Sequence, residues 1–133
     1  MHAHLAKLLV STDYQTLRYR GAFLLYLMIL MWGSVPGARE EIGQVASGVV
    51  LHTIAYGGLT FLLFSGSAGT PLRRAATALA TIALMGALDE LVQSFVPFRR
   101  GTLTDWLVDC NAGLIMSAIL WAFWPKVERA YRG

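Results

Sequence analysis

The chain has 133 residues, of which 56% are hydrophobic and only 14% are charged, and its net charge is +3. Together with a mean hydropathy of +0.53, this composition excludes an ordinary soluble domain and indicates an integral membrane protein. Four apolar runs are long enough to cross a hydrocarbon core of roughly 30 Å as helices. They lie near 21–36, 45–66, 75–96 and 106–124. None has the alternation of a transmembrane strand, so we expect an all-α membrane protein with four transmembrane helices in one bundle, a single domain over 1–133.

The first apolar run follows about twenty residues that include several cations. A signal peptide is the alternative, because small residues at 34–38 could form a cleavage site. The preceding region is long for that role, so we predict an uncleaved anchor. Before this anchor, residues 2–17 are expected to form a short helix at the cytoplasmic membrane interface through Leu5, Leu8 and Leu9.

Breaks between the apolar runs are marked by turn residues. The sequence at 35–37 is Val-Pro-Gly and is expected to close the first helix, while the polar stretch 66–71 separates the second helix from the third. Pro97 is expected to end the third helix.

The distribution of cations predicts the orientation. If both termini are cytoplasmic, most cations lie on the cytoplasmic side: Lys7, Arg18, Arg20, Arg73, Arg74, Lys126, Arg129 and Arg132. The outer side then carries only Arg39, offset by Glu40 and Glu41, together with Arg99 and Arg100. The net charge therefore reflects topology and gives no indication of nucleic-acid binding.

Four tryptophans fall at the proposed boundaries. Trp32 and Trp106 would mark the outer interface, and Trp121 and Trp124 the inner one. Cys110 is the only cysteine, so an intrachain disulfide is excluded, and we expect it to be a small packing residue.

Polar residues interrupt the apolar runs at similar depths. Ionisable groups within a membrane are costly and usually functional. His52 would lie on the order of 10 Å below the outer interface. Asp89 and Glu90 would lie at a similar depth, because the third helix runs outward and ends shortly after them. On this basis one set of side chains shares the outer half of the bundle: His52, Glu90, Gln93, Asp105 and Asp109.

Helical spacing places these residues on common faces, because positions three or four apart are neighbours. The faces are formed by His52 with Tyr56, by Glu90 with Gln93, and by Asp105 with Asp109 and Gly113. Small residues nearby would let the helices approach closely: Ala83, Gly86, Ala112 and Gly113.

The combined pattern resembles the VanZ-like family of small bacterial membrane proteins. It consists of His52-x-x-x-Tyr56, then Glu90-x-x-Gln93-x-x-x-Pro97-x-Arg99, then Asp105 and Asp109, and the resemblance covers roughly residues 45–120. It implies a multi-pass protein of the bacterial cytoplasmic (inner) membrane, linked through the family's name to resistance to the glycopeptide antibiotic teicoplanin, without a defined reaction. The family's ligand-site positions would fall on His52, Tyr56, Glu90, Gln93, Arg99, Asp105 and Asp109.

Two departures from the family pattern concern other positions. Gly48 and Val49 stand where an Asp-Lys pair commonly precedes the histidine. The later small-residue repeat is shifted, and Asn111 interrupts it. A function that depends on the Asp-Lys pair is therefore not expected of this chain.

Each site residue also has a structural interpretation. His52 would either bind a ligand or simply hydrogen-bond a carboxylate of a neighbouring helix, and Tyr56 would pack. Glu90, if ionised, needs a cation from His52 or Arg99. Asp89 points about 100° away from Glu90 around the helix and is expected to matter less.

The loop residues leave two alternatives open. Arg99 would bind a carboxylate or phosphate, or instead clamp Asp105 to shape the loop. Asp105 would alternatively cap the fourth helix.

Three functional classes follow. The first is binding of an envelope component, lipid-linked ligand or protein partner. The second is an intramembrane enzyme acting on a lipid-linked or phosphorylated substrate, with His52 and Glu90 as an acid/base pair. The third is a small transporter, which ranks last because the inner halves of the helices lack titratable groups. Binding is preferred, with no cofactor and no metal expected, since one histidine and scattered carboxylates make a poor metal signature.

Overall fold

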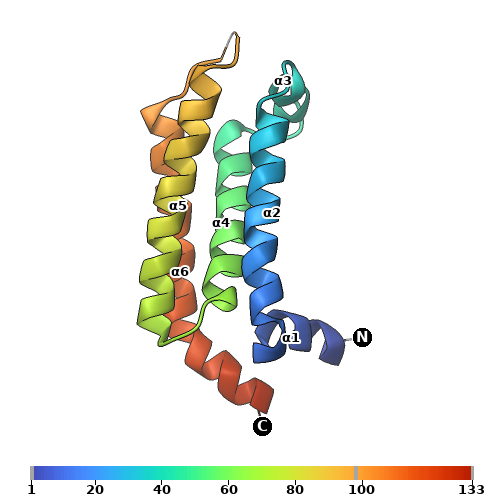
Figure 1. Ribbon diagram of the computed structural model, residues 1–133, viewed down its shortest axis with the longest axis vertical. Helices are drawn as coiled ribbons and strands as arrows, with labels where there is room; N and C mark the ends of the chain where they lie inside the picture. Colours follow the sequence, from blue (N-terminus) through green and yellow to red (C-terminus); the bar gives the residue numbers. More distant parts are fainter. Residues whose placement is uncertain (1, 98, 133) are drawn as a thin grey trace.

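The computed structural model describes residues 2–97 and 99–132, and these ranges contain helices and no strand. The expected all-α class is thereby confirmed. Four long helices lie side by side along the long axis of the molecule (Figure 1). They are α2 (Gln15–Gly33), α4 (Gly48–Gly66), α5 (Pro71–Ser94) and α6 (Leu103–Arg132). Three short elements complete the fold: α1 (His2–Val10), the 3-10 turn η1 (Thr12–Tyr14) and α3 (Ala38–Gly43).

Among the described residues, three helices are long and apolar enough to cross a membrane, namely α4, α5 and α6. Helix α2 carries the predicted first span but does not reach the same apolarity, because Arg18 and Arg20 occupy its first two turns. Its remaining part is strongly apolar and exposes large side chains, including Leu24, Met28 and Met31.

The predicted breaks between the helices are confirmed, although the helices begin at other residues than predicted, at Gln15, Gly48, Pro71 and Leu103. Helix α4 ends at Gly66 and α5 begins at Pro71, where the Thr70 side chain accepts a hydrogen bond from the Arg73 backbone N–H at 3.3 Å. The turn after α2 contains Gly37 at φ 83°, a left-handed conformation that favours glycine. Helix α5 ends at Ser94, shortly before Pro97.

The C-terminal helix differs from the expectation. It was predicted to end near 124 but continues through Pro125 to Arg132. A proline inside a helix removes one backbone hydrogen bond and bends the axis without ending it, and the last part of α6 runs off at an angle (Figure 1). Trp124 is 3% exposed and packs edge-on against Phe61 and Phe64, so it does not lie at a lipid-facing boundary.

Helices α5 and α6 pack closely through the glycines that the sequence indicated. A Cβ on Gly113 would lie 2.8 Å from Ile82 Cγ2, and one on Gly86 would lie 3.0 Å from Asp109 Oδ2. The apolar core lies between α2, α4, α5 and α6 and includes Ala22, Leu59 and Phe64.

Near the chain termini, Arg18 fixes the start of α2. Its guanidinium donates to the backbone carbonyls of Leu8, Ser11 and Ser65 at 2.7 to 3.3 Å. The polar residues of the candidate site lie toward the opposite end, which we call the α3 end (Figure 1).

Candidate functional site

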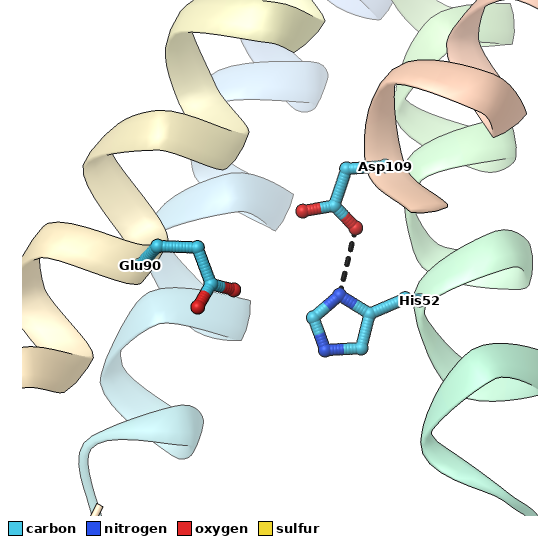
Figure 2. Close-up of side chains that lie close together, drawn as sticks. All are labelled: His52, Glu90 and Asp109. Carbon is cyan, nitrogen blue, oxygen red and sulfur yellow. Dashed lines mark hydrogen bonds and ion pairs between the residues drawn. The ribbon is translucent and has the colours of Figure 1, made fainter. Parts of the chain in front are cut away.

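Three helices each contribute one ionisable side chain to a common point near the α3 end. His52 of α4, Glu90 of α5 and Asp109 of α6 have ligand atoms that all lie within 4.8 Å of one another. The sequence predicted this convergence from depth and from helical spacing. Figure 2 shows the two carboxylates and the imidazole turned toward the same space between the helices.

His52 and Asp109 form a direct pair. Nδ1 of His52 lies 2.7 Å from Oδ1 of Asp109, and the Asp109 side chain is fully buried (Figure 2). If Nδ1 carries the proton, it donates to the carboxylate, and the other ring nitrogen is left to accept or to bind a cation. The pair therefore fixes the orientation of the imidazole.

Glu90 takes a different partner from the one expected. The sequence suggested His52 or Arg99 as its cation, but Glu90 Oε2 accepts a hydrogen bond from the Thr102 backbone N–H at 2.6 Å. The reason is the loop after α5, which folds back against the helix. Gly101 lies so close to the Glu90 backbone that a Cβ would overlap the carbonyl oxygen.

Asp89 was expected to be the less important of the two adjacent carboxylates, yet it is 3% exposed and belongs to the site. Tyr56 donates its hydroxyl hydrogen to Asp89 Oδ2 at 3.2 Å. The Tyr56 ring also lies parallel to the His52 ring, with centroids 6.0 Å apart. Asp89 is four residues before Gln93, and this spacing was the signal that would have placed it on the buried face.

Asp105 is held by an arginine that the sequence did not single out. Arg39 Nη2 of α3 lies 3.2 Å from Asp105 Oδ2, so the alternative in which Arg99 clamps Asp105 is wrong. Nor does Asp105 cap α6, because the Thr102 hydroxyl accepts from the Asp105 backbone N–H at 3.1 Å. The Arg39 pair instead ties the α2–α4 connection to the start of α6.

A cavity of about 380 Å³ opens beside this cluster, between α2, α3, α4 and α5. Apolar side chains of α2 and α4 form much of its wall, including Leu25, Met28, Ile29 and Leu51. Polar groups gather along the rest: Arg39, His52, Tyr56, Asp89, Gln93 and Arg99. The residues Glu90, Asp105 and Asp109 do not line this cavity.

Several polar atoms of the cavity residues are buried but have no hydrogen-bond partner within the described protein. They are Arg99 Nη1, Gln93 Oε1 and Asp89 Oδ1. Buried polar groups in native proteins are nearly always paired. Arg99 Nη1 would lie 3.8 Å from a Cβ on Gly33, which places the guanidinium beside the end of α2. The cavity thus combines an apolar wall with an unpaired guanidinium.

A second, shallower groove lies on the other side of Glu90. Its lining includes Ala87, Leu91, Ser94, Gly101 and Thr102 together with Glu90. Glu90 is therefore accessible from a groove that is separate from the cavity lined by His52. Cys110, the residue after Asp109, is a partly buried free thiol, consistent with the packing role expected for it.

No family model, curated protein or solved structure matches the chain.

Proposed function

We propose that this protein is a VanZ-like protein of the bacterial inner membrane that binds an amphiphilic envelope ligand with an anionic head group, such as a lipid-linked phosphate. The observation that carries the proposal is the buried, unpaired Nη1 of Arg99 beside a largely apolar cavity. A guanidinium binds phosphate or carboxylate through two parallel hydrogen bonds. A link to teicoplanin resistance through this binding is part of the same proposal.

The chemistry of the lining supports an amphiphile over a small polar metabolite. Leu25, Met28 and Ile29 lie on one face of α2 and provide an apolar surface for an acyl or prenyl chain. Arg99 provides the donor for the anionic group, whereas the acceptor oxygens of Gln93 and Asp89 would pair with hydroxyl or amide groups of the head group. A cavity of about 380 Å³ accommodates a head group and the first few carbons of a chain.

We propose further that α2 completes a four-helix membrane bundle with α4, α5 and α6, with both termini in the cytoplasm. The support is the contact of α2 with α4, the exposed apolar side chains of α2 and the cations near the termini and in the α4–α5 turn. In this orientation the α3 end, and with it the cavity, faces outward.

Cysteine labelling tests the orientation. In a Cys110→Ala background, Glu41→Cys at the α3 end is expected to react with a membrane-impermeant maleimide in intact spheroplasts. Ala68→Cys, in the turn between α4 and α5, is expected to react only after permeabilisation. Both positions are exposed, so accessibility alone does not separate them. Labelling of Ala68→Cys but not Glu41→Cys in intact spheroplasts would contradict the proposed orientation.

Arg99→Ala is expected to weaken lipid retention at least about tenfold, because a charge-assisted bidentate contact contributes roughly 1.5 to 3 kcal/mol. The measurement is native mass spectrometry from mild detergent after incubation with a polyprenyl phosphate. Arg100→Ala is the matched control, since Arg100 is the adjacent exposed arginine and does not line the cavity. Equal retention by the wild type, Arg99→Ala and Arg100→Ala would contradict the assignment.

A second candidate is an intramembrane enzyme acting on the same ligand class. The observation in its favour is the His52–Asp109 pair at 2.7 Å, since a buried carboxylate that orients an imidazole is a common arrangement for a general base. His52 lines the cavity, so its second ring nitrogen would act on a group bound there. The same mass spectra separate the two functions, because an enzyme would release a lipid of changed mass. A transporter remains the third candidate.

A further inference from the structure

We infer that His52, Glu90 and Asp109 form a binding site for one divalent transition-metal ion, with Zn²⁺ as the best-fitting ion. The inference concerns the chain's own residues and does not depend on the lipid proposed above. One imidazole and two carboxylates are ligands that Zn²⁺ accepts in sites with three protein ligands and an open position.

The three side chains come from three different helices, and their ligand atoms lie within 4.8 Å of one another (Figure 2). Ligands of a tetrahedral ion bound at about 2.1 Å lie roughly 3.4 Å apart. His52 Nδ1 and Asp109 Oδ1 lie 2.7 Å apart. An ion that replaced the shared proton would therefore require these two atoms to separate by about 0.7 Å. Glu90, whose Oε2 accepts from the Thr102 backbone N–H, would offer its free oxygen Oε1 to the ion.

The two carboxylates of the trio each have an oxygen without a hydrogen-bond partner among the described residues. Asp109 is fully buried and Glu90 is 9% exposed. Each has one buried oxygen, Asp109 Oδ2 and Glu90 Oε1, with no hydrogen-bond partner in the described part of the chain. The carboxylate groups of both residues face the space between them in Figure 2. A cation bound beside the imidazole would give both oxygens a partner.

The negative charge around the trio also favours a bound cation. Asp89, Glu90 and Asp109 bring three carboxylates into one buried region, and none of them forms an ion pair with a lysine or arginine within residues 2–97 and 99–132. Arg39, the cation of the α3 turn, is paired with Asp105. A divalent ion bound to Glu90, Asp109 and a neutral His52 would balance the charge of two carboxylates. Burying them without a cation would be costly.

The surroundings also suit an exchangeable ion. Glu90 borders the shallow groove near Thr102, and His52 borders the larger cavity. An ion held between them would keep an open coordination position toward either space. The backbone N–H of Thr102, which donates to Glu90 Oε2, would orient the carboxylate from outside the coordination sphere.

The test uses the full chain purified in mild detergent through a tag without histidines. After treatment with a chelator, the protein is incubated with Zn²⁺, desalted and analysed for metal by mass spectrometry. About one Zn²⁺ per chain is expected for the wild type, and Glu90→Gln and Asp109→Asn are expected to weaken binding at least about tenfold. Glu41→Gln is the matched control, because it removes an exposed carboxylate at the α3 end outside the trio and is expected to retain the ion.

The melting temperature of the wild type and of the control variant provides a second readout. This readout does not depend on whether Glu90→Gln and Asp109→Asn fold. Zn²⁺ is expected to raise the melting temperature of the wild type and of Glu41→Gln, whereas Mg²⁺ is not, since a ligand that binds only the folded state stabilises it. Folded wild-type protein without Zn²⁺ above trace, or equal Zn²⁺ in the wild type and Asp109→Asn, would overturn the inference. No lipid is present in either assay, so failure here leaves the lipid proposal to its own test.

Discussion

Replacing His52 by leucine is expected to lower the free energy of unfolding by about 3 kcal/mol. The variant leaves the carboxylate of Asp109, which is fully buried, without the imidazole that lies 2.7 Å away. A buried carboxylate that loses its partner must either remain charged without compensation or take up a proton, and both are costly. Unfolding in mixed detergent micelles, followed by circular dichroism, measures the change.

The double variant His52→Leu/Asp109→Leu is the control for this prediction. Two apolar side chains of similar size remove the charge together with its partner, so the stability is expected to return to within about 1 kcal/mol of the wild type. If His52→Leu is as stable as the wild type, or if the double variant loses more than His52→Leu, the pair does not hold the helices as described.

Gly101→Ala is expected to cost about 2 kcal/mol and to release the loop after α5 from the helix. A Cβ at this position would overlap the Glu90 carbonyl oxygen and lie 2.9 Å from the carbonyl carbon, and both atoms belong to the backbone. The loop would have to move away, and the hydrogen bond from the Thr102 N–H to Glu90 Oε2 would be lost. The melting temperature measures the loss of stability, and hydrogen exchange of the Thr102 amide measures whether the loop after α5 is released.

Gly58→Ala is the matched control for the loop prediction. Gly58 lies inside α4 with nothing within 4 Å of a new Cβ, so the substitution is expected to be neutral or slightly stabilising. Faster exchange at Thr102 in Gly101→Ala but not in Gly58→Ala would support the close contact. A melting temperature of Gly101→Ala equal to that of Gly58→Ala would mean that the loop does not pack against Glu90.

The sequence predicted those parts of the site that depend on distance along a helix. Counting residues from the expected membrane boundaries put His52, Glu90 and Asp109 at a similar level, and the structure brings them together. The spacing of Gly86 and Gly113 likewise predicted where α5 and α6 pack closely. Such features follow from the rise and period of a helix and need no knowledge of the loops.

The pairings that depend on loops or on helix rotation were not predictable in the same way. Arg39 reaches Asp105 from the connection between α2 and α4, and Thr102 reaches Glu90 because Gly101 permits close approach. The rotation of α5, which turns Asp89 toward Tyr56, is decided by packing against two neighbouring helices. The pattern of hydrophobic residues along the sequence cannot predict these contacts.

The retention of a lipid phosphate relative to its neutral alcohol tests the central claim most directly. Wild-type protein in mild detergent is offered equal amounts of a polyprenyl phosphate and the corresponding polyprenol, and bound species are identified by native mass spectrometry. The phosphate is expected to be retained at least about tenfold better, because only the phosphate pairs with the guanidinium of Arg99. Equal retention of both lipids would contradict an anion-binding site in the cavity.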